Sequence, residues 1–215
     1  MRKRLIVFFV LACAVMLASV GNAQNNNQAV FGIDSDLTAV GLQGGRVVRG
    51  IGPSTDVGFA VYVKNVDAFF GYMIDITWDG TKASLRDRDS GTEIFEDTVS
   101  INGADNVALA AEGNILGSDI LSIGEVNETS HYSNQYAKQG GEAVASSDYG
   151  LLYILVLRTA ATFTTDDRFA VTVKLTAANK EAVAKDLGEL TFYVNGGVDV
   201  KSSTWGEIKK QYKDF

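Results

Sequence analysis

The chain has 215 residues, of which 19 are Lys or Arg and 26 are Asp or Glu, giving a formal net charge of −7 at pH 7. Such an acidic chain repels nucleic acid and anionic lipid, and no basic cluster in the sequence offsets this repulsion, which excludes nucleic-acid binding. One cysteine, Cys13, and one histidine, His131, exclude disulfides and any zinc site built from several thiolates or imidazoles.

Residues 1–23 have the pattern of a signal peptide. Arg2, Lys3 and Arg4 precede an apolar run, and small residues precede a cleavage point between Ala23 and Gln24. Losing three of the 19 basic residues leaves 16 against 26 acidic ones, a net charge of −10. We therefore expect a secreted or cell-surface, extracellular protein without a membrane span. A lipoprotein box ending at Cys13 is the alternative, which the apolar residues after this cysteine disfavour.

The remaining chain alternates apolar and polar residues with a period of two, as half-buried β-strands do. The pattern predicts strands over residues 57–64, 71–78, 119–126, 150–160, 168–177 and 187–194. The segment 150–160 is apolar at nearly every position, which indicates a central strand covered on both faces. Glycines and Asn or Asp pairs mark the turns, so we expect one all-β domain over residues 24–200.

The stretch GYMIDITWDGTKASL, residues 71–85, contains the clearest alternation. Tyr72, Ile74, Ile76 and Trp78 share one face, which we expect to be buried. Three residues share the other, exposed face and are the candidate partner-binding residues: Met73, Asp75 and Thr77. A flat sheet face with one apolar residue among polar ones suits a reversible contact with a protein.

Residues 127–149 are polar and aperiodic, which predicts a long surface loop. Within it, Tyr132, Tyr136 and Tyr149 are the best candidates for exposed aromatic residues. They would serve as a stacking platform for carbohydrate or as anchors of a protein interface. His131 lies in the same segment, and no serine in the chain has a nucleophile-elbow pattern around it, so catalysis through this histidine is not expected.

Acidic residues offer two further sites to consider. Asp87, Asp89 and Glu93, with Gly91 between them, resemble half of a calcium loop, but the spacing is incomplete and an acidic turn between strands is the simpler explanation. Paired carboxylates could hydrolyse glycosides, but none lies in an apolar context that would raise its pKa. We therefore expect no enzyme and no cofactor, with calcium as the one alternative.

The final residues 201–215 change to a helical pattern. Thr204 can cap a helix, with Glu207 three residues later, and Ile208, Tyr212 and Phe215 recur at helical spacing. A short helix of this kind is stable only when it docks, so it would close an open end of the domain or serve as an export or attachment tag.

The stretch VGFAVYVKNVDAFFGYMIDITWDGTKASL resembles the first half of a cohesin-type domain, the binding module of secreted bacterial proteins. An Asn65-Val66 turn, a strand that begins at Gly71 and the pair Trp78-Asp79 occur in that family's order, and the leucine-rich strand at 150–157 resembles a later one. The resemblance covers roughly residues 28–200. It implies a cohesin-like jelly-roll β-sandwich of about nine strands, followed here by the short C-terminal helix, and a dockerin-like protein partner. Gly71 and Met73 stand where dockerin-binding members carry polar side chains.

Together these observations predict a non-catalytic module that acts by protein–protein contact at the cell surface or in an extracellular assembly. Two alternatives stay open. One is a carbohydrate-binding module of similar fold that holds polysaccharide with the three tyrosines. The other is a self-associating structural subunit of a surface layer or fibre, in which the Asn-rich segment near residue 24 adds a strand to a neighbour.

Overall fold

The structure is a computed structural model, and it describes residues 26–38, 41–89, 100–101, 104–105, 114–117 and 120–196. Three expectations lie outside these residues: the signal peptide, the end of the predicted domain at residues 197–200 and the helical tail at 201–215. Within the described part, every regular element is a strand, which confirms the all-β class. No helix of the described residues is long and apolar enough to cross a membrane.

The described residues form fifteen strands, several of them only two or three residues long. Their bounds are β1 Val30–Asp34, β2 Val47–Val48, β3 Asp56–Lys64, β4 Val66–Phe69, β5 Gly71–Thr77, β6 Ala83–Asp89, β7 Ser100–Ile101, β8 Ala104–Asp105, β9 Ile120–Ser122, β10 Val126–Glu128, β11 His131–Lys138, β12 Val144–Ser146, β13 Gly150–Thr159, β14 Phe169–Ala178 and β15 Ala184–Val194. The predicted strands at 57–64, 71–78, 150–160, 168–177 and 187–194 are all present within a few residues.

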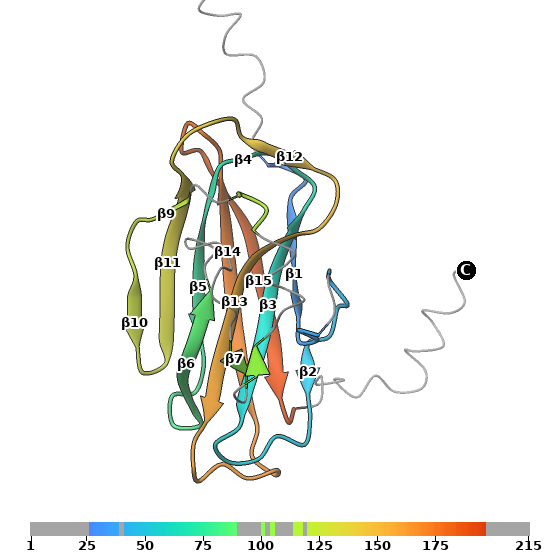
Figure 1. Cartoon of the computed structure of the whole chain (residues 1–215), viewed down its shortest axis with the longest axis vertical. Coiled ribbons are helices and arrows are strands. Elements are labelled where there is room, and N and C mark those ends of the chain that lie inside the picture. Colours follow the sequence, from blue (N-terminus) through green and yellow to red (C-terminus); the bar gives the residue numbers. More distant parts are fainter. Residues whose placement is uncertain are drawn as a thin grey trace, which may run out of the picture.

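Two packed sheets make up the sandwich (Figure 1). One has four strands in the order β1-β3-β13-β6. The other has the order β10-β11-β5-β14-β15-β2, and β9 also pairs with β11. β5 lies at the centre of this seven-stranded sheet, between β11 and β14, so its side chains have strand neighbours on both sides.

The main core lies between the sheets, and period-two alternation builds it. On β5, Tyr72, Ile74 and Ile76 point inward and are buried, as the sequence predicts. On the opposite sheet, Phe59 packs against Phe192 of β15 with ring centroids 5.3 Å apart. Replacing one such buried ring by alanine costs about 3–5 kcal/mol. A shift of register by one residue would expose these rings, so their burial fixes the register of both sheets.

The outer face of the four-stranded sheet is also apolar and buried, unlike that of the seven-stranded sheet. Tyr62 of β3 and Ile154 and Val156 of β13 form a second cluster there, against which Leu37 and Leu42 pack. This confirms that residues 150–160 are a central strand covered on both faces. The open sheet face of the molecule is therefore the outer face of the seven-stranded sheet.

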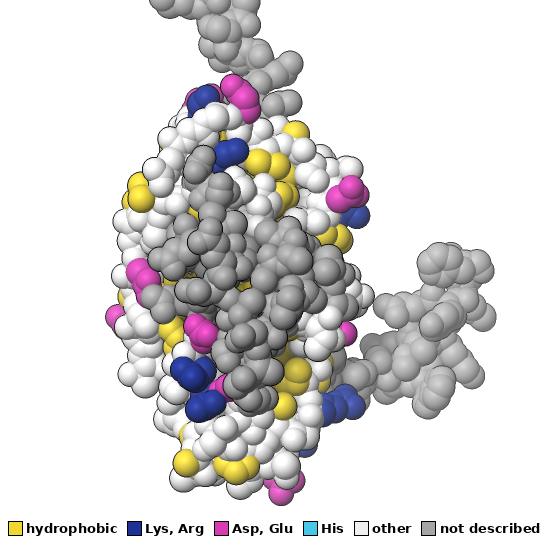
Figure 2. Space-filling view, viewed as in Figure 1, with side chains coloured by type: hydrophobic (Ala, Val, Ile, Leu, Met, Phe, Trp, Pro, Cys, Tyr) yellow, Lys and Arg dark blue, Asp and Glu magenta, His cyan; other side chains and the backbone are white. Residues whose placement is uncertain are grey.

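The seven-stranded sheet ends in two strands of opposite charge character, on opposite sides of the molecule in Figure 1. β10 includes Glu128 and follows Glu125, and β2 lies between Arg46 and Arg49. In the space-filling view of Figure 2, acidic side chains lie at the left margin, where β10 lies in Figure 1, and basic ones at the lower right margin, near β2. Among the strands that the structure describes, none pairs with the outer edge of β10 or of β2.

Candidate functional site

The outward face of β5 presents the three residues that the sequence singles out. Met73 is 41% exposed, Thr77 is exposed and Asp75 is half-buried, because the strand turns every second side chain away from the core. Their neighbours across β11 and β14 are mostly polar: Gln135, Ser133 and His131 on one side, and Thr176, Lys174 and Thr172 on the other. The structure therefore places the predicted set on the middle strand of the open sheet face.

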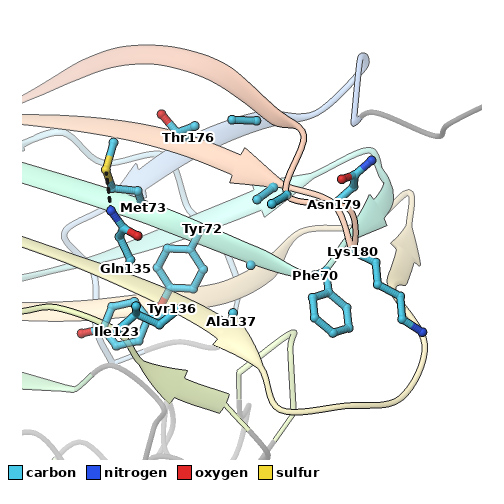
Figure 3. A pocket seen from close by; sticks show the side chains of 14 residues that line it. Phe70, Tyr72, Met73, Ile123, Gln135, Tyr136, Ala137, Thr176, Asn179 and Lys180 are labelled. Atoms are coloured by element: carbon cyan, nitrogen blue, oxygen red, sulfur yellow. Dashed lines mark hydrogen bonds between the residues drawn. The ribbon is translucent and has the colours of Figure 1, made fainter.

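A groove of about 390 Å³ lies at one end of this face, where β5 begins and β11 and β14 end (Figure 3). Its lining is mostly apolar. Phe70, Tyr72 and Tyr136 supply rings, and Met73 and Ile123 supply aliphatic side chains. Small residues leave the space: Gly71, Ala137, Ala178, Ala182 and Ala184. Ile123 is 57% exposed, so an apolar group of a partner would find open hydrophobic surface beside Met73.

Phe70 and Lys180 border the groove (Figure 3). The Lys180 ammonium lies 6.0 Å from the centre of the Phe70 ring and donates a hydrogen bond of 3.2 Å to the Gly141 carbonyl. Lys180 thus places a charged group at the rim of an apolar groove. Protein-binding surfaces usually have this arrangement, with an apolar centre and a polar rim.

At the other end of the face, His131 lies between two carboxylates. Its Nε2 atom is 3.1 Å from Oδ2 of Asp75, and its Nδ1 atom is 3.9 Å from Oε2 of Glu128. Lys174 lies beside Asp75 on β14 and pairs with Glu189 at 3.7 Å. The face therefore combines an apolar end with a charged end, where the two ring nitrogens of His131 face the carboxylates of Asp75 and Glu128.

Among the described residues, no three His, Cys, Asp or Glu side chains come close enough together to hold a metal ion. Asp87 and Asp89 were expected in a calcium loop or an acidic turn. The turn is wrong, because both residues lie within strand β6, and the calcium site stays a prediction that the strand disfavours. An extended strand sends its residues along a line, whereas calcium needs a tight turn that brings several oxygens to one point. Glu93 lies outside the described residues.

The predicted tyrosine platform is also wrong. Tyr132 and Tyr136 are buried, at 0% and 2% exposed, and their hydroxyl groups are 2.9 Å apart inside the sandwich. Only Tyr149 is exposed, at 38%, and the Lys64 ammonium lies 5.0 Å from its ring centre. A single exposed ring cannot form a flat row for sugar stacking.

The expected loop at 127–149 contains β11, a full strand of the open face. Gln135 and Ala137 line the groove from this strand, and Ile123 lies just after β9. Sequence reasoning missed Gln135 and Ala137 because residues 127–149 were assigned to a loop. Ile123 was placed in the predicted strand at 119–126 but not in a site. The signal that could have found β11 is the alternation of Tyr132, Asn134 and Tyr136, since aromatic residues favour strands.

No known family model matches the chain, and no curated protein matches it. Several solved structures do. The sixth cohesin of scaffoldin B from Acetivibrio cellulolyticus, solved in complex with a dockerin, matches with 13% identity over 79% of this chain and 99% of that one, at a TM-score of 0.47. The cohesin CaCohA2 from Clostridium acetobutylicum matches with 16% identity over 80% of this chain and 94% of that one, at a TM-score of 0.48. A type II cohesin from Acetivibrio cellulolyticus matches with 12% identity over 81% of this chain and 99% of that one, at a TM-score of 0.48. The chain is thus similar in structure to cohesin modules, the family that its residues resemble.

Proposed function

We propose that the chain is a secreted, non-catalytic module that binds a protein partner through the outer face of the seven-stranded sheet. The observation that carries this proposal is the apolar groove of about 390 Å³ beside the exposed Met73, on the open face of a rigid sheet. An apolar pocket with polar neighbours suits the anchor side chain of a partner, around which the polar residues exclude water.

The partner that we propose is a protein with a dockerin-like helical module. Its support is the resemblance of residues 57–85 to a cohesin-type domain, together with the groove. An amphipathic helix that lies along the face would place an apolar side chain beside Met73 and polar groups against Asp75 and Thr77. Carbohydrate binding has less support, because two of the three tyrosines on which it depended are buried.

A capture experiment tests the proposal. Residues 24–215 would be immobilised and exposed to secreted and envelope fractions of the host, with calcium and with a chelator, and bound proteins identified by mass spectrometry. Met73→Arg places a charge beside the groove, and Val30→Arg is the matched control, because Val30 is 46% exposed and lies on the other sheet.

We expect the wild-type chain and Val30→Arg to retain the same few proteins, and Met73→Arg to bind them at least about tenfold more weakly, as for loss of an interface anchor. Equal retention by Met73→Arg would show that the partner binds elsewhere. Recovery of polysaccharide alone would replace the proposal with the carbohydrate-binding alternative.

A further inference from the structure

The two edges of the seven-stranded sheet are complementary in charge and in residue spacing. At one edge, Glu125 and Glu128 lie on either side of Val126, and Val126 is 41% exposed. At the other edge, Arg46 and Arg49 flank Val47 and Val48, and both arginines are exposed. The two charged residues are three positions apart at each edge, so one alignment of the strands can pair both arginines with both glutamates.

The directions of the two strands decide which alignment this is. Four antiparallel pairings lead from β10 through β11, β5 and β14 to β15, and β2 is parallel to β15. β10 and β2 therefore run in the same direction. If a second copy continues the sheet in the same orientation, its β2 lies parallel to β10 of the first.

In that parallel alignment, the paired side chains of β2 and β10 also lie on the same face of the sheet. Val126 and Glu128 are opposite Ser133 and His131 of β11, which point outward, and Val47 is opposite the outward residue Tyr193. Placing Val47 beside Val126 puts Arg49 beside Glu128 on the same outward face. It also puts Arg46 beside Glu125.

β2 directs backbone hydrogen-bonding groups toward the outer edge of the sheet, where a further strand would pair. The carbonyl groups of Arg46 and Val48 accept hydrogen bonds from the amides of Tyr193 and Asn195. Because successive residues of a strand direct their backbone groups to opposite sides, the amide and carbonyl of Val47 point away from β15. On the other edge, Leu121 and Ile123 are 52% and 57% exposed, and residues 120–128 contain no proline, lysine or arginine that would discourage pairing.

We propose that copies of this chain assemble head to tail by pairing β10 of one copy with β2 of the next. The contact joins two different surfaces, so each added copy leaves one acidic and one basic edge open, and growth does not stop at a dimer. The occupant of the β10 edge is thus a second copy of the chain. This contact pairs residues 46–49 with residues 125–128, none of which lines the groove on which the proposed function rests.

Charge reversal tests this assembly. Glu125→Lys with Glu128→Lys makes both edges basic, and Arg46→Glu with Arg49→Glu makes both acidic. Glu142→Lys with Glu181→Lys is the matched control for the glutamate variant, because it raises the net charge of the chain by the same amount at exposed positions away from both edges. Sedimentation velocity over a range of concentrations, at low and high salt, measures the average mass of residues 24–215.

We expect the average mass of the wild-type chain and the control to rise with concentration past that of a dimer, and to fall in high salt. Each edge variant alone should assemble at least about tenfold more weakly, because like charges then meet. An equimolar mixture of the two edge variants should recover assembly, since every contact again joins opposite charges.

A wild-type chain that stays monomeric at all concentrations would overturn the proposal, as would assembly that both edge variants retain or that their mixture does not recover. Circular dichroism checks the fold of each variant. Where a double variant is not folded, the single changes Glu128→Lys and Arg49→Glu replace it in the same comparison.

Discussion

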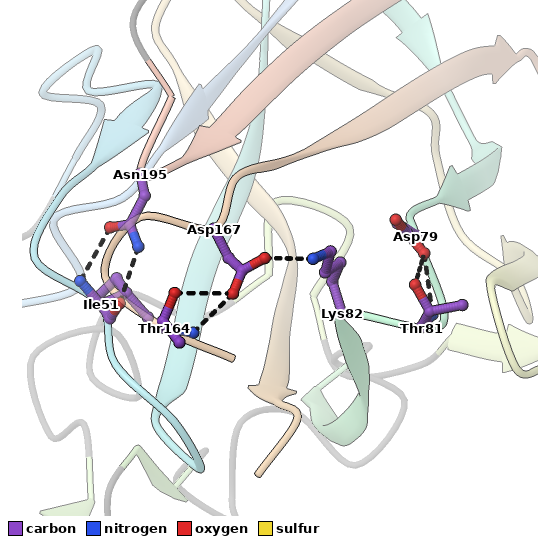
Figure 4. A network of polar contacts seen from close by, with 7 residues as sticks. All are labelled: Ile51, Asp79, Thr81, Lys82, Thr164, Asp167 and Asn195. Atoms are coloured by element: carbon purple, nitrogen blue, oxygen red, sulfur yellow. Dashed lines mark hydrogen bonds and ion pairs between the residues drawn. The ribbon is translucent and has the colours of Figure 1, made fainter. Parts of the chain in front are cut away.

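The Asp167 carboxylate accepts a hydrogen bond from the Lys82 ammonium, which joins the turn after β5 to the loop between β13 and β14 (Figure 4). The same carboxylate accepts hydrogen bonds from the backbone amide and the hydroxyl of Thr164, at 2.8 and 2.9 Å. Asp79 fixes the neighbouring turn by accepting two hydrogen bonds from Thr81. These contacts close the end of the sandwich that lies opposite the groove.

The contacts of Asp167 predict a pH dependence of stability. The Lys82 hydrogen bond, followed by the two from Thr164, lowers the pKa of Asp167 from 3.8 to about 2. A carboxyl group whose pKa is lower in the folded state stabilises the fold above its unfolded pKa, and this contribution is lost as the pH falls through the folded pKa. The stability difference between the wild-type chain and Asp167→Asn should therefore be present above pH 3.8, shrink as the pH falls from there, and be lost below about pH 2.

Urea unfolding of both proteins at about pH 5 and about pH 2 measures this difference. Asp166→Asn is the control, because the neighbouring Asp166 takes no part in the hydrogen bonds of Asp167. A difference between wild type and Asp167→Asn that is the same at both pH values would contradict the role given to this carboxylate.

Two buried tyrosines should respond differently to loss of the hydroxyl group. The Tyr72 hydroxyl donates a hydrogen bond of 2.9 Å to the Leu152 carbonyl, so Tyr72→Phe should lower the free energy of unfolding by about 1 kcal/mol. The Tyr153 hydroxyl is buried without a hydrogen-bond partner among the described residues, and burial raises the pKa of Tyr153 well above 10. Tyr153→Phe should leave the free energy of unfolding unchanged or raise it. Urea denaturation compares them, and equal losses would contradict the prediction.

The sequence predicted the strands whose inward residues are apolar. Ile74 and Ile76 on β5, Val171 and Val173 on β14, and Trp78 beyond β5 are all buried as expected, because burial of apolar side chains at every second position leaves a readable pattern. Met73 could be placed on the outer face by the same parity. The groove could not be predicted, because it depends on residues from four strands and from the segments that connect strands, which meet only in the folded sheet.

β11 and β6 were missed because their patterns are not apolar. The inward residues of β11 are two tyrosines and Asn134, which are less apolar than aliphatic residues, so their alternation is weak in hydropathy. β6 carries Arg86 and Asp87 and lies at a sheet edge, where charged side chains reach solvent. Both strands are held by backbone pairing to a neighbour, which a sequence pattern does not show.

Gly71 is needed at the start of β5 because the neighbouring strand approaches it closely. A Cβ atom at this position would lie 2.6 Å from the Tyr136 carbonyl oxygen and 3.2 Å from Cα of Ala137. Both contacts are with the backbone of β11, so Gly71→Ala must push the strands apart and should cost about 1–3 kcal/mol. Gly140→Ala, which would meet nothing within 4 Å, should change stability by less than about 0.5 kcal/mol. Thermal or urea unfolding of the pair measures this, and equal stability of the two variants would contradict it.

Asn134 connects the edge of the sheet to the interior. Its Oδ1 atom accepts a hydrogen bond from the Gln135 amide at 2.7 Å, and its Nδ2 atom donates to the Ser122 hydroxyl at 2.8 Å and to the Tyr136 hydroxyl at 2.9 Å. Ser122 belongs to β9, so one buried amide holds an edge strand and a core tyrosine together.

Asn134→Ala should therefore lower the free energy of unfolding by about 1–3 kcal/mol, because buried polar partners lose their contacts. The loss of stability should be largest near β9, so amide hydrogen exchange of residues 120–124 should accelerate more than that of β5 or β13. Ser122→Ala removes one of these contacts at an exposed position and should show a smaller change in the same segment. If exchange at 120–124 were unchanged in Asn134→Ala, β9 would be held by its backbone pairing with β11 alone. β9 continues the edge formed by β10, so loosening of β9 should also weaken the head-to-tail assembly. Sedimentation would then give Asn134→Ala a lower average mass than the wild-type chain.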